Sequence, residues 1–146
     1  MSIRDLYERV SELPIAHPDP TRGLIKARNI DEIKLEVRDT DCPVRLLLPS
    51  TEGQMAFVAI GTMTETLWRI RDLCLWQPVT AGSGIEQCAD DMLGYIELYL
   101  AGLKSLRNPA PGCTLESVTM QMGPVPWATT DFWAVDTLLE IREITP

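Results

Sequence analysis

The chain has 146 residues, a length typical of one domain of about 100–200 residues. Apolar residues make up 45% of it and charged residues 23%, which suits a chain folded around a hydrophobic core and excludes a disordered or fibrous protein. Its 21 acidic and 13 basic side chains give a formal charge of −8, which argues against a general nucleic-acid-binding protein because phosphates require a positive surface. No apolar run reaches the roughly 20 residues of a transmembrane helix, so we expect one soluble domain over residues 1–146.

A short helix is predicted at the start of the chain, over residues 2–12. Its apolar side chains recur at the spacing of one helix face: Ile3, Leu6, Tyr7 and Val10. Pro14 is expected to end the helix, because the residue before a proline avoids helical backbone angles. Proline-rich residues 14–23 follow, and we expect them to form an ordered surface loop or an arm that contacts a neighbouring molecule.

Three strands are predicted before the middle of the chain. Apolar and charged residues alternate over 33–37, and a second short apolar run covers 44–48. The clearest strand signal is residues 64–76, a long segment rich in branched and aromatic side chains. Because this segment carries charges on both of its faces, we expect Arg71 and Asp72 to have partners elsewhere in the fold.

A long amphipathic helix is predicted over residues 85–105. The face expected to pack on a sheet follows the helical period: Ile85, Ala89, Met92, Leu93, Ile96, Leu100 and Leu103. Further strands are predicted over 114–122 and 132–144, and the glycine and prolines of 123–126 are expected to end the first of them. The last strand is expected to point a set of side chains inward: Trp133, Val135, Thr137, Leu139 and Ile141.

The order of these elements predicts the α+β class. Strands and helices do not alternate along the chain as they do in folds built around a parallel sheet. We therefore expect an antiparallel or mixed β-sheet packed against one long amphipathic helix, with a short N-terminal helix beside it. The sequence shows no internal repeat, no low-complexity segment and no second domain.

The cysteines and the single histidine do not form a metal-binding pattern. Cys42, Cys74, Cys88 and Cys113 lie far apart, so none of them forms the paired half-site of a structural zinc. The only histidine is His17, which lies among prolines. No hydrophobic leader follows the first residue. We therefore expect reduced thiols, at least two of them in the core, and no metal.

Catalytic motifs are also missing from the sequence. The Gly82-Ser83-Gly84 loop lies between a strand and a helix, but Gln87 stands where a dinucleotide-binding motif has its third glycine. Asp90 and Asp91 are adjacent and would point about 100° apart on a helix, so they cannot form a carboxylate dyad. A serine hydrolase needs a histidine base close to a nucleophilic serine, and no such motif occurs. We expect no enzyme and no cofactor.

Tryptophans at strand ends suggest an interface. Trp68 and Trp133 are expected in the core, because they lie inside predicted strands. Trp76 and Trp127 lie beside prolines at strand ends and fit either core packing or a protein interface, in which tryptophan is enriched. With Phe132, they are the candidate residues for contact with an oligomer neighbour or another partner. The edges of long strands also need a cover, and pairing between subunits provides one.

Part of the sequence resembles the tail terminator (tail completion) proteins of tailed bacteriophages. The resemblance begins with residues 67–78, followed by Gly82 and Gly84 and by an acidic helix that contains Tyr95 and Tyr99. It continues into a C-terminal pattern: Pro126, Trp127, Phe132, Trp133, Ala134, Val135, Leu138, Leu139, Glu140 and Ile141. The strand of residues 45–49, with its polar loop, also fits. The similarity covers roughly residues 44–143 and consists of hydrophobic patterns with aromatic residues at intervals.

The resemblance implies a structural protein of the virion, made in the host cytoplasm. Members of this family form a hexameric ring on the head-proximal end of the tail tube, where they end tube growth and join the tail to the head. The expected partners are further copies of the chain, the tail tube protein, and a head-side connector or stopper protein. Duplex DNA is expected to pass through a lumen lined by sheets without specific binding, and an acidic lumen would let it slide. No membrane is involved.

Two alternatives remain open from the sequence. The nearer is another neck protein, a head-tail adaptor or stopper, which shares the size and the ring symmetry. The more distant is a small cytoplasmic α+β domain that binds a ligand. Self-assembly separates the ring proteins from the ligand-binding domain, and binding to the tail tube separates a terminator from an adaptor.

Overall fold

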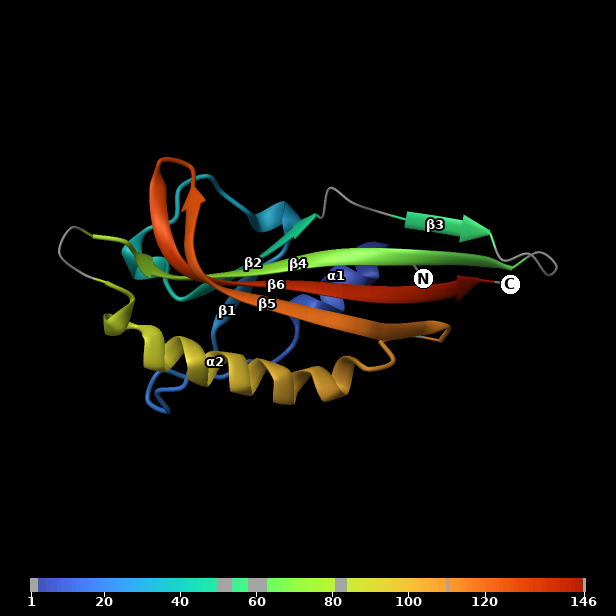
Figure 1. Ribbon diagram of the computed structural model, residues 1–146, viewed down its shortest axis with the longest axis horizontal. Helices are drawn as coiled ribbons and strands as arrows, with labels where there is room; N and C mark the ends of the chain where they lie inside the picture. The colour runs from blue at the N-terminus through green and yellow to red at the C-terminus, as the bar shows by residue number, and fades with distance from the viewer. Residues whose placement is uncertain (1–2, 50–53, 58–62, 81–83, 110, 146) are drawn as a thin grey trace.

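A computed structural model describes residues 3–49, 54–57, 63–80, 84–109 and 111–145 (Figure 1). Its centre is a mixed six-stranded sheet in the order β1-β2-β4-β6-β5, with β3 paired to β4 beyond the end of β2. The strands are β1 (Lys26–Arg28), β2 (Val44–Pro49), β3 (Gln54–Phe57), β4 (Thr64–Pro78), β5 (Cys113–Trp127) and β6 (Thr130–Thr145). Only the β1–β2 pair is parallel among the described strands. The α+β class expected from the sequence is confirmed.

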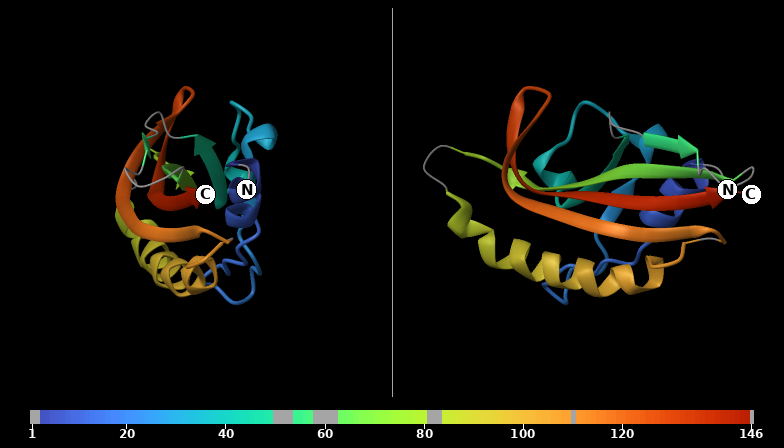
Figure 2. Two further views of the ribbon diagram at one scale, coloured as in Figure 1. Left: turned by 90° about the vertical axis from the view of Figure 1, so that its right-hand side faces the viewer. Right: turned by 45° about the vertical axis from the view of Figure 1, so that its right-hand side comes forward.

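Two helices cover one face of the sheet (Figures 1 and 2). They are α1 (Ile3–Ser11) and α2 (Ala89–Gly102), and α2 is extended at each end by a 3₁₀ turn, η3 (Ile85–Gln87) and η4 (Leu103–Leu106). Apolar side chains from both helices meet the alternate residues of β4 in the main core, among them Leu6, Val10, Tyr95, Ile70 and Cys74. The helices predicted over 2–12 and 85–105 are therefore confirmed.

A second core cluster lies on the opposite face of the sheet. It contains Val44, Leu46, Leu73, Leu75, Phe132 and Ala134. Residues 33–42 and the bent tip of the β5–β6 hairpin cover it, with half-buried contacts from Ile33, Val37 and Trp127 (Figure 2). Because neighbouring residues of a strand point to opposite faces, β2, β4 and β6 supply both cores from alternate positions.

The strand predicted over residues 33–37 is wrong. These residues are irregular, and the nearest strand, β1, ends five positions before residue 33. Two 3₁₀ turns, η1 (Ile30–Glu32) and η2 (Asp39–Asp41), enclose the segment, and the Asn29 side chain caps the first of them. Ile33 and Val37 pack on the second core, whereas the side chain of Leu35 between them is 79% exposed. The alternation of apolar and charged residues over 33–37 therefore does not mark one buried strand face.

The predicted end of a strand at residues 123–126 is also wrong. β5 continues through Pro124 and Pro126 and turns into β6 after Trp127. Proline is tolerated there because β5 is an edge strand, so an amide that faces away from β6 has no ladder bond to lose.

The buried face of α2 differs in part from the prediction. Met92, Tyr95, Tyr99 and Leu103 form the line against the sheet, while the side chains of Leu93 and Leu100 are 51% and 48% exposed. The inward set predicted for β6 is confirmed at Val135, Thr137, Leu139 and Ile141, all fully buried. Trp133 is half-buried and packs against the same core.

The proline-rich loop of residues 14–23 is held against its own chain. The His17 N–H donates to the Gly23 carbonyl at 2.8 Å, and the Ile25 N–H donates to the Ile15 carbonyl at 2.9 Å. Gly23 has a φ of 71°, a conformation that glycine adopts without strain. Ile15 is buried beneath the loop. Residues 14–23 therefore form a loop that is hydrogen-bonded to its own chain.

Candidate interface and buried polar network

A buried ion pair joins strands β2 and β4 inside the main core. Arg45 of β2 and Asp72 of β4 are both fully buried, and the Arg45 Nη2 and Nε atoms lie 2.6 Å and 3.1 Å from Asp72 Oδ2. The Tyr99 hydroxyl of α2 donates to the same oxygen at 2.8 Å. The Arg45 guanidinium also donates to the carbonyls of Val10 and Leu13, at 3.0 Å and 3.1 Å. One side chain therefore joins the sheet, the end of α1 and, through Asp72, helix α2.

The electrostatics of this network favour the charged form of the arginine. Burial by itself lowers the pKa of Arg45, but the Asp72 carboxylate outweighs burial and raises it. Burial raises the pKa of Tyr95 and of Tyr99 well above 10.0, so both phenols stay neutral. The expectation that Asp72 has a partner is confirmed. Since every member is deep in the core, the network serves the fold and offers no surface to a substrate.

The face of the sheet opposite the helices carries a row of ion pairs. Arg71 forms a bidentate pair with Asp136, with N–O distances of 2.9 Å and 2.8 Å, which confirms the expected partner. The hydrogen bond to Asp136 raises the pKa of Arg71. Farther along the strands, Arg69 lies 3.1 Å from Glu140, and Arg142 lies within 3.1 Å of two carboxylates, those of Glu65 and Glu116. Three guanidinium groups and four carboxylates leave this surface with a net charge of −1.

The predicted interface residues divide into two groups. Trp76 is 6% exposed and Phe132 is 1% exposed, so both lie in the core and have no side-chain surface to offer a partner. This corrects the prediction for these two residues. Trp127 is half-buried at the tip of the β5–β6 hairpin, and its Nε1–H donates to the Lys34 carbonyl at 3.4 Å. Of the three, only Trp127 retains exposed surface.

The outer edge of β5 is open along its middle. At one end the Leu115 N–H donates to the Arg107 carbonyl at 3.0 Å, so the chain covers its own edge there. At the other end Pro124 and Pro126 have no N–H to donate. The N–H groups of an antiparallel strand point alternately toward and away from its partner strand. Between the two blocked ends, the N–H groups of residues 118, 120 and 122 therefore point away from β6. Among the described strands, none pairs with this stretch.

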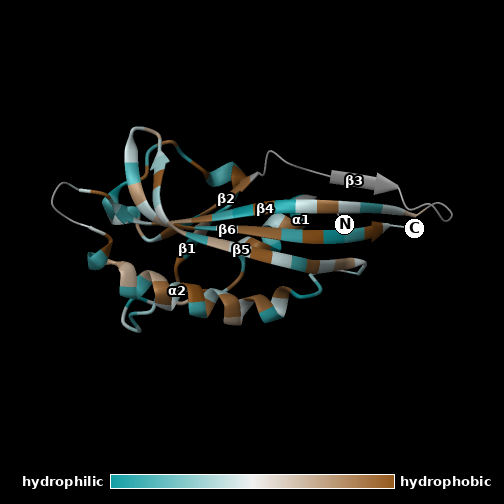
Figure 3. Cartoon of the chain, in the orientation of Figure 1, coloured by the Kyte–Doolittle hydropathy of each residue, from teal (hydrophilic) through white to brown (hydrophobic). Residues whose placement is uncertain are grey.

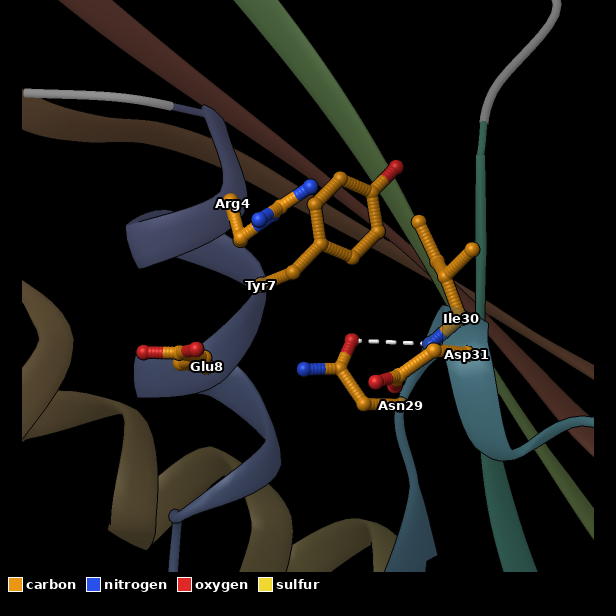
Figure 4. Close-up of a pocket in the computed structure, with 6 residues that line it drawn as sticks. All are labelled: Arg4, Tyr7, Glu8, Asn29, Ile30 and Asp31. Atoms are coloured by element: carbon orange, nitrogen blue, oxygen red, sulfur yellow. Dashed lines mark hydrogen bonds between the residues drawn. The ribbon is translucent and has the colours of Figure 1, made fainter.

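A pocket of about 480 Å³ opens between α1 and η1 (Figure 4). It is lined by Arg4, Tyr7, Glu8, Asn29, Ile30 and Asp31. The Asn29 side chain is engaged, because its oxygen accepts the Ile30 N–H at 2.8 Å, and the Tyr7 hydroxyl donates to the Leu48 carbonyl at 3.2 Å. The lining offers mixed charge and no pairing of a nucleophile with a base.

The cysteines are free and mostly buried. Cys74, Cys88 and Cys113 are buried and Cys42 is half-buried, as expected of reduced thiols in a core. Burial, aided by Asp41 and Asp39, raises the pKa of Cys42 to about 12, so its thiol stays protonated and unreactive near neutral pH. Among the described residues, no group of three or more potential ligands could hold a metal ion. Residues 82 and 83 of the glycine-rich loop lie outside the described part of the chain.

His17 is buried against the indole of Trp76, with ring centroids 5.1 Å apart. Its Nδ1 accepts the backbone N–H of Asp19 at 2.9 Å, which requires a neutral ring with its proton on Nε2. Burial lowers the pKa of His17 below 6.5, and Arg22 lowers it further, while Asp91 and Asp19 act in the opposite direction. The neutral imidazole of His17 therefore stabilises the 14–23 loop through this hydrogen bond.

Stability is expected to fall as His17 becomes protonated. Because the pKa is lower in the folded chain than the unfolded value of 6.5, the unfolded state binds more protons as the pH falls. The stabilisation from neutral His17 is complete at pH values above its unfolded-state pKa of 6.5, and it is lost progressively as the pH falls below that value. Urea unfolding of wild type and His17→Asn at about pH 7 and about pH 5 should show the smaller decrease in the variant. Equal decreases would contradict this role for the ring.

No protein-family model matches the sequence, and no curated protein matches it. Within the described residues, no helix has the length and apolar character to cross a membrane.

Proposed function

We propose that the protein is a structural subunit of a phage tail, a tail terminator that forms a hexameric ring at the head-proximal end of the tail tube. In this role copies of the chain assemble head to tail, end the growth of the tube, and offer a surface to the head-side connector. Duplex DNA passes through the lumen of the ring. The resemblance of residues 44–143 to this family suggests the role.

The open middle of the β5 edge is the observation that carries the proposal. Long exposed edge strands are a hazard for a monomer, and proteins usually block them or pair them. Here both ends of the edge are blocked, by the Arg107 carbonyl and by Pro124 and Pro126, while the stretch between them keeps its donors and acceptors. An edge protected everywhere except in one stretch suits a defined partner strand.

The face with the ion-pair row supports a second part of the proposal. Its arginines are each matched by a carboxylate, and its net charge is slightly negative. The three paired arginines of this row leave no unmatched guanidinium within it to hold phosphate groups, which favours DNA sliding along it.

Light scattering at rising protein concentration tests the self-assembly. We expect the molar mass to approach six times that of the 16.3-kDa chain, with negative-stain images of a six-fold ring whose central hole is near the width of duplex DNA. Binding of that ring to tail tubes rather than to portal complexes would separate a terminator from an adaptor. A ring of another order would contradict the hexamer, and a monomer at every concentration would contradict self-assembly in solution.

A further inference from the structure

Helix α2 presents apolar side chains that its own sheet does not cover. Gly94 and Gly102 mark one flank of the helix, since a Cβ added to either would touch Pro18 or Ile15 of the N-terminal segment. The side chains of α2 and η4 that are buried against the sheet form one line along the helix: Met92, Tyr95, Tyr99 and Leu103. Leu93, Ile96 and Leu100 lie on the side of this line opposite the two glycines. That flank faces the β5 side of the sheet, along which α2 runs in Figures 1 and 2.

These side chains and the open β5 edge form one continuous surface, which we name the α2–β5 shelf. It comprises Leu93, Ile96 and Leu100 of α2 and the outward backbone of residues 118–122 of β5. Ile96, Val118 and Met120 pack half-buried against the main core, which places the helix flank beside the strand. Figure 3 shows the hydrophobic segments along α2 beneath the sheet. Leu93 and Leu100 remain about half exposed because the sheet lacks a further strand above them.

The shelf has the shape that strand addition requires. An extended segment placed beside β5 would exchange main-chain hydrogen bonds with residues 118, 120 and 122. Every second side chain of that segment would then point toward α2 and cover Leu93 and Leu100. The charge beside the shelf is slightly negative, because Asp90 and Glu97 lie on that side of α2 and Lys104 follows in η4.

The opposite edge of the same sheet has the complementary chemistry. Strand β1 lies there and contains two basic residues in three positions. Lys26, Arg28, Glu32 and Lys34 line a hollow there, and Arg28 also forms an ion pair with Asp41 at 3.4 Å. Apolar side chains are exposed on either side of β1, with Leu24 at 66% and Ile30 at 44%. With Asp41 counted, the hollow beside β1 has a net charge of +1, and the side chains beside the shelf, Asp90, Glu97 and Lys104, have a net charge of −1.

We propose that the α2–β5 shelf of one copy receives the β1 edge of the next copy, so that the sheet continues from subunit to subunit. Such a contact joins two different surfaces of the same chain, and heterologous contacts of this kind close into rings when the rotation allows. The proposal rests on the ring of the proposed function and assigns its contact surface. Exposed Glu97, between Leu93 and Leu100 along the helix, faces the basic β1 side of the neighbour.

Met122→Pro tests the backbone part of the contact. Proline at this outward position removes one donor from the edge, as Pro124 and Pro126 already do, and leaves the bonds to β6 in place. We expect a monomer, or assembly only at a concentration on the order of tenfold higher. Met122→Ala keeps the N–H and is the matched control, for which assembly should be close to wild type. Leu100→Lys alters only the exposed helix flank, so it tests the shelf even if the proline variant does not fold.

A mixing experiment tests the direction of the contact. Lys26→Glu should block the β1 edge but leave the shelf intact, whereas Met122→Pro should do the reverse. Each variant alone should be monomeric, and the mixture should form a dimer and nothing larger, because only one good contact remains. Lys26→Glu combined with Glu97→Lys in one chain should restore assembly.

The outcomes separate this inference from the proposed function. Rings that persist in Met122→Pro and in Leu100→Lys would overturn the shelf and leave the terminator ring standing. Assembly of wild type into a closed ring of a different order, abolished by the shelf variants, would support the shelf and contradict the hexameric terminator. A wild-type chain that stays monomeric at every concentration would overturn the shelf.

Discussion

Replacing Arg45 with methionine is expected to destabilise the protein by about 3–5 kcal/mol, the cost of leaving one partner of a buried ion pair without the other. The Asp72 carboxylate would keep only the Tyr99 hydroxyl as a donor. The carbonyls of Val10 and Leu13 would lose their donors as well, which would free the end of α1. Chemical unfolding followed by tryptophan fluorescence measures this loss.

Arg69→Met is the matched control for that experiment. It removes the same side chain from the ion pair with Glu140, whose side chains are partly exposed, at 20% and 28%. Pairs of this kind contribute about 0–1 kcal/mol, since water screens the charges and solvates the remaining partner. If Arg45→Met and Arg69→Met cost the same, the buried network would not be the main anchor of α1.

A double variant distinguishes the ion pair from the packing around it. Arg45→Met with Asp72→Asn removes both charges, so no uncompensated carboxylate remains in the core. We expect it to be more stable than Arg45→Met alone, because an unpaired buried charge costs more than the loss of the pair. A double variant that is less stable than either single variant would contradict this account.

The sequence predicted that Asp72 has a partner but not which one. A carboxylate on the buried face of a long strand requires a cation, and that requirement can be read from residues 64–76 alone. The partner lies 27 positions away on a short strand whose register depends on the whole sheet. Arg45 alternates with Val44 and Leu46, so its neighbours suggest an exposed position. Only the second core on the other face shows that both sides of β2 are buried.

The helix prediction was limited in a similar way. The period identified α2 and its length, but Leu93 and Leu100 fit the apolar pattern as well as the residues that are buried. Tyr99 takes the inner line because its hydroxyl donates to Asp72, and the ring of Tyr95 packs against the ring of Tyr99 at a centroid distance of 5.6 Å. A helix with apolar residues on most of its sides does not reveal which flank its own sheet covers. That ambiguity concealed the α2–β5 shelf, which became evident from exposure and strand order.

The candidate interface was predicted least well because the sequence could not separate core from surface tryptophans. Trp76 and Trp127 both stand beside a proline near the end of a predicted strand. In the fold, the loop of residues 14–23 returns over Trp76 and places His17 against its ring, whereas the hairpin tip leaves Trp127 at the surface. Contacts between segments 59 residues apart decide this difference, and no local pattern records them.

Trp76→Ala and Trp127→Ala are therefore expected to destabilise the chain to different extents. Trp76 packs on both His17 and Tyr95, with ring centroids 5.1 Å and 5.8 Å away, so its loss should destabilise the chain by about 3–5 kcal/mol. Trp127→Ala should cost at most about 2 kcal/mol, because the indole is only partly buried and its hydrogen bond to the Lys34 carbonyl is long, at 3.4 Å. Thermal unfolding with light scattering on the same samples measures both effects.

The comparison also decides whether Trp127 contacts a partner. If Trp127→Ala keeps its melting temperature near that of wild type but weakens binding to tail tubes, the hairpin tip is a docking site of the ring. Trp127→Phe keeps an aromatic ring over the second core and removes only the N–H, so it separates packing from hydrogen bonding. A Trp127→Ala variant that unfolds as readily as Trp76→Ala would show that the indole mainly holds residues 33–42 against the sheet.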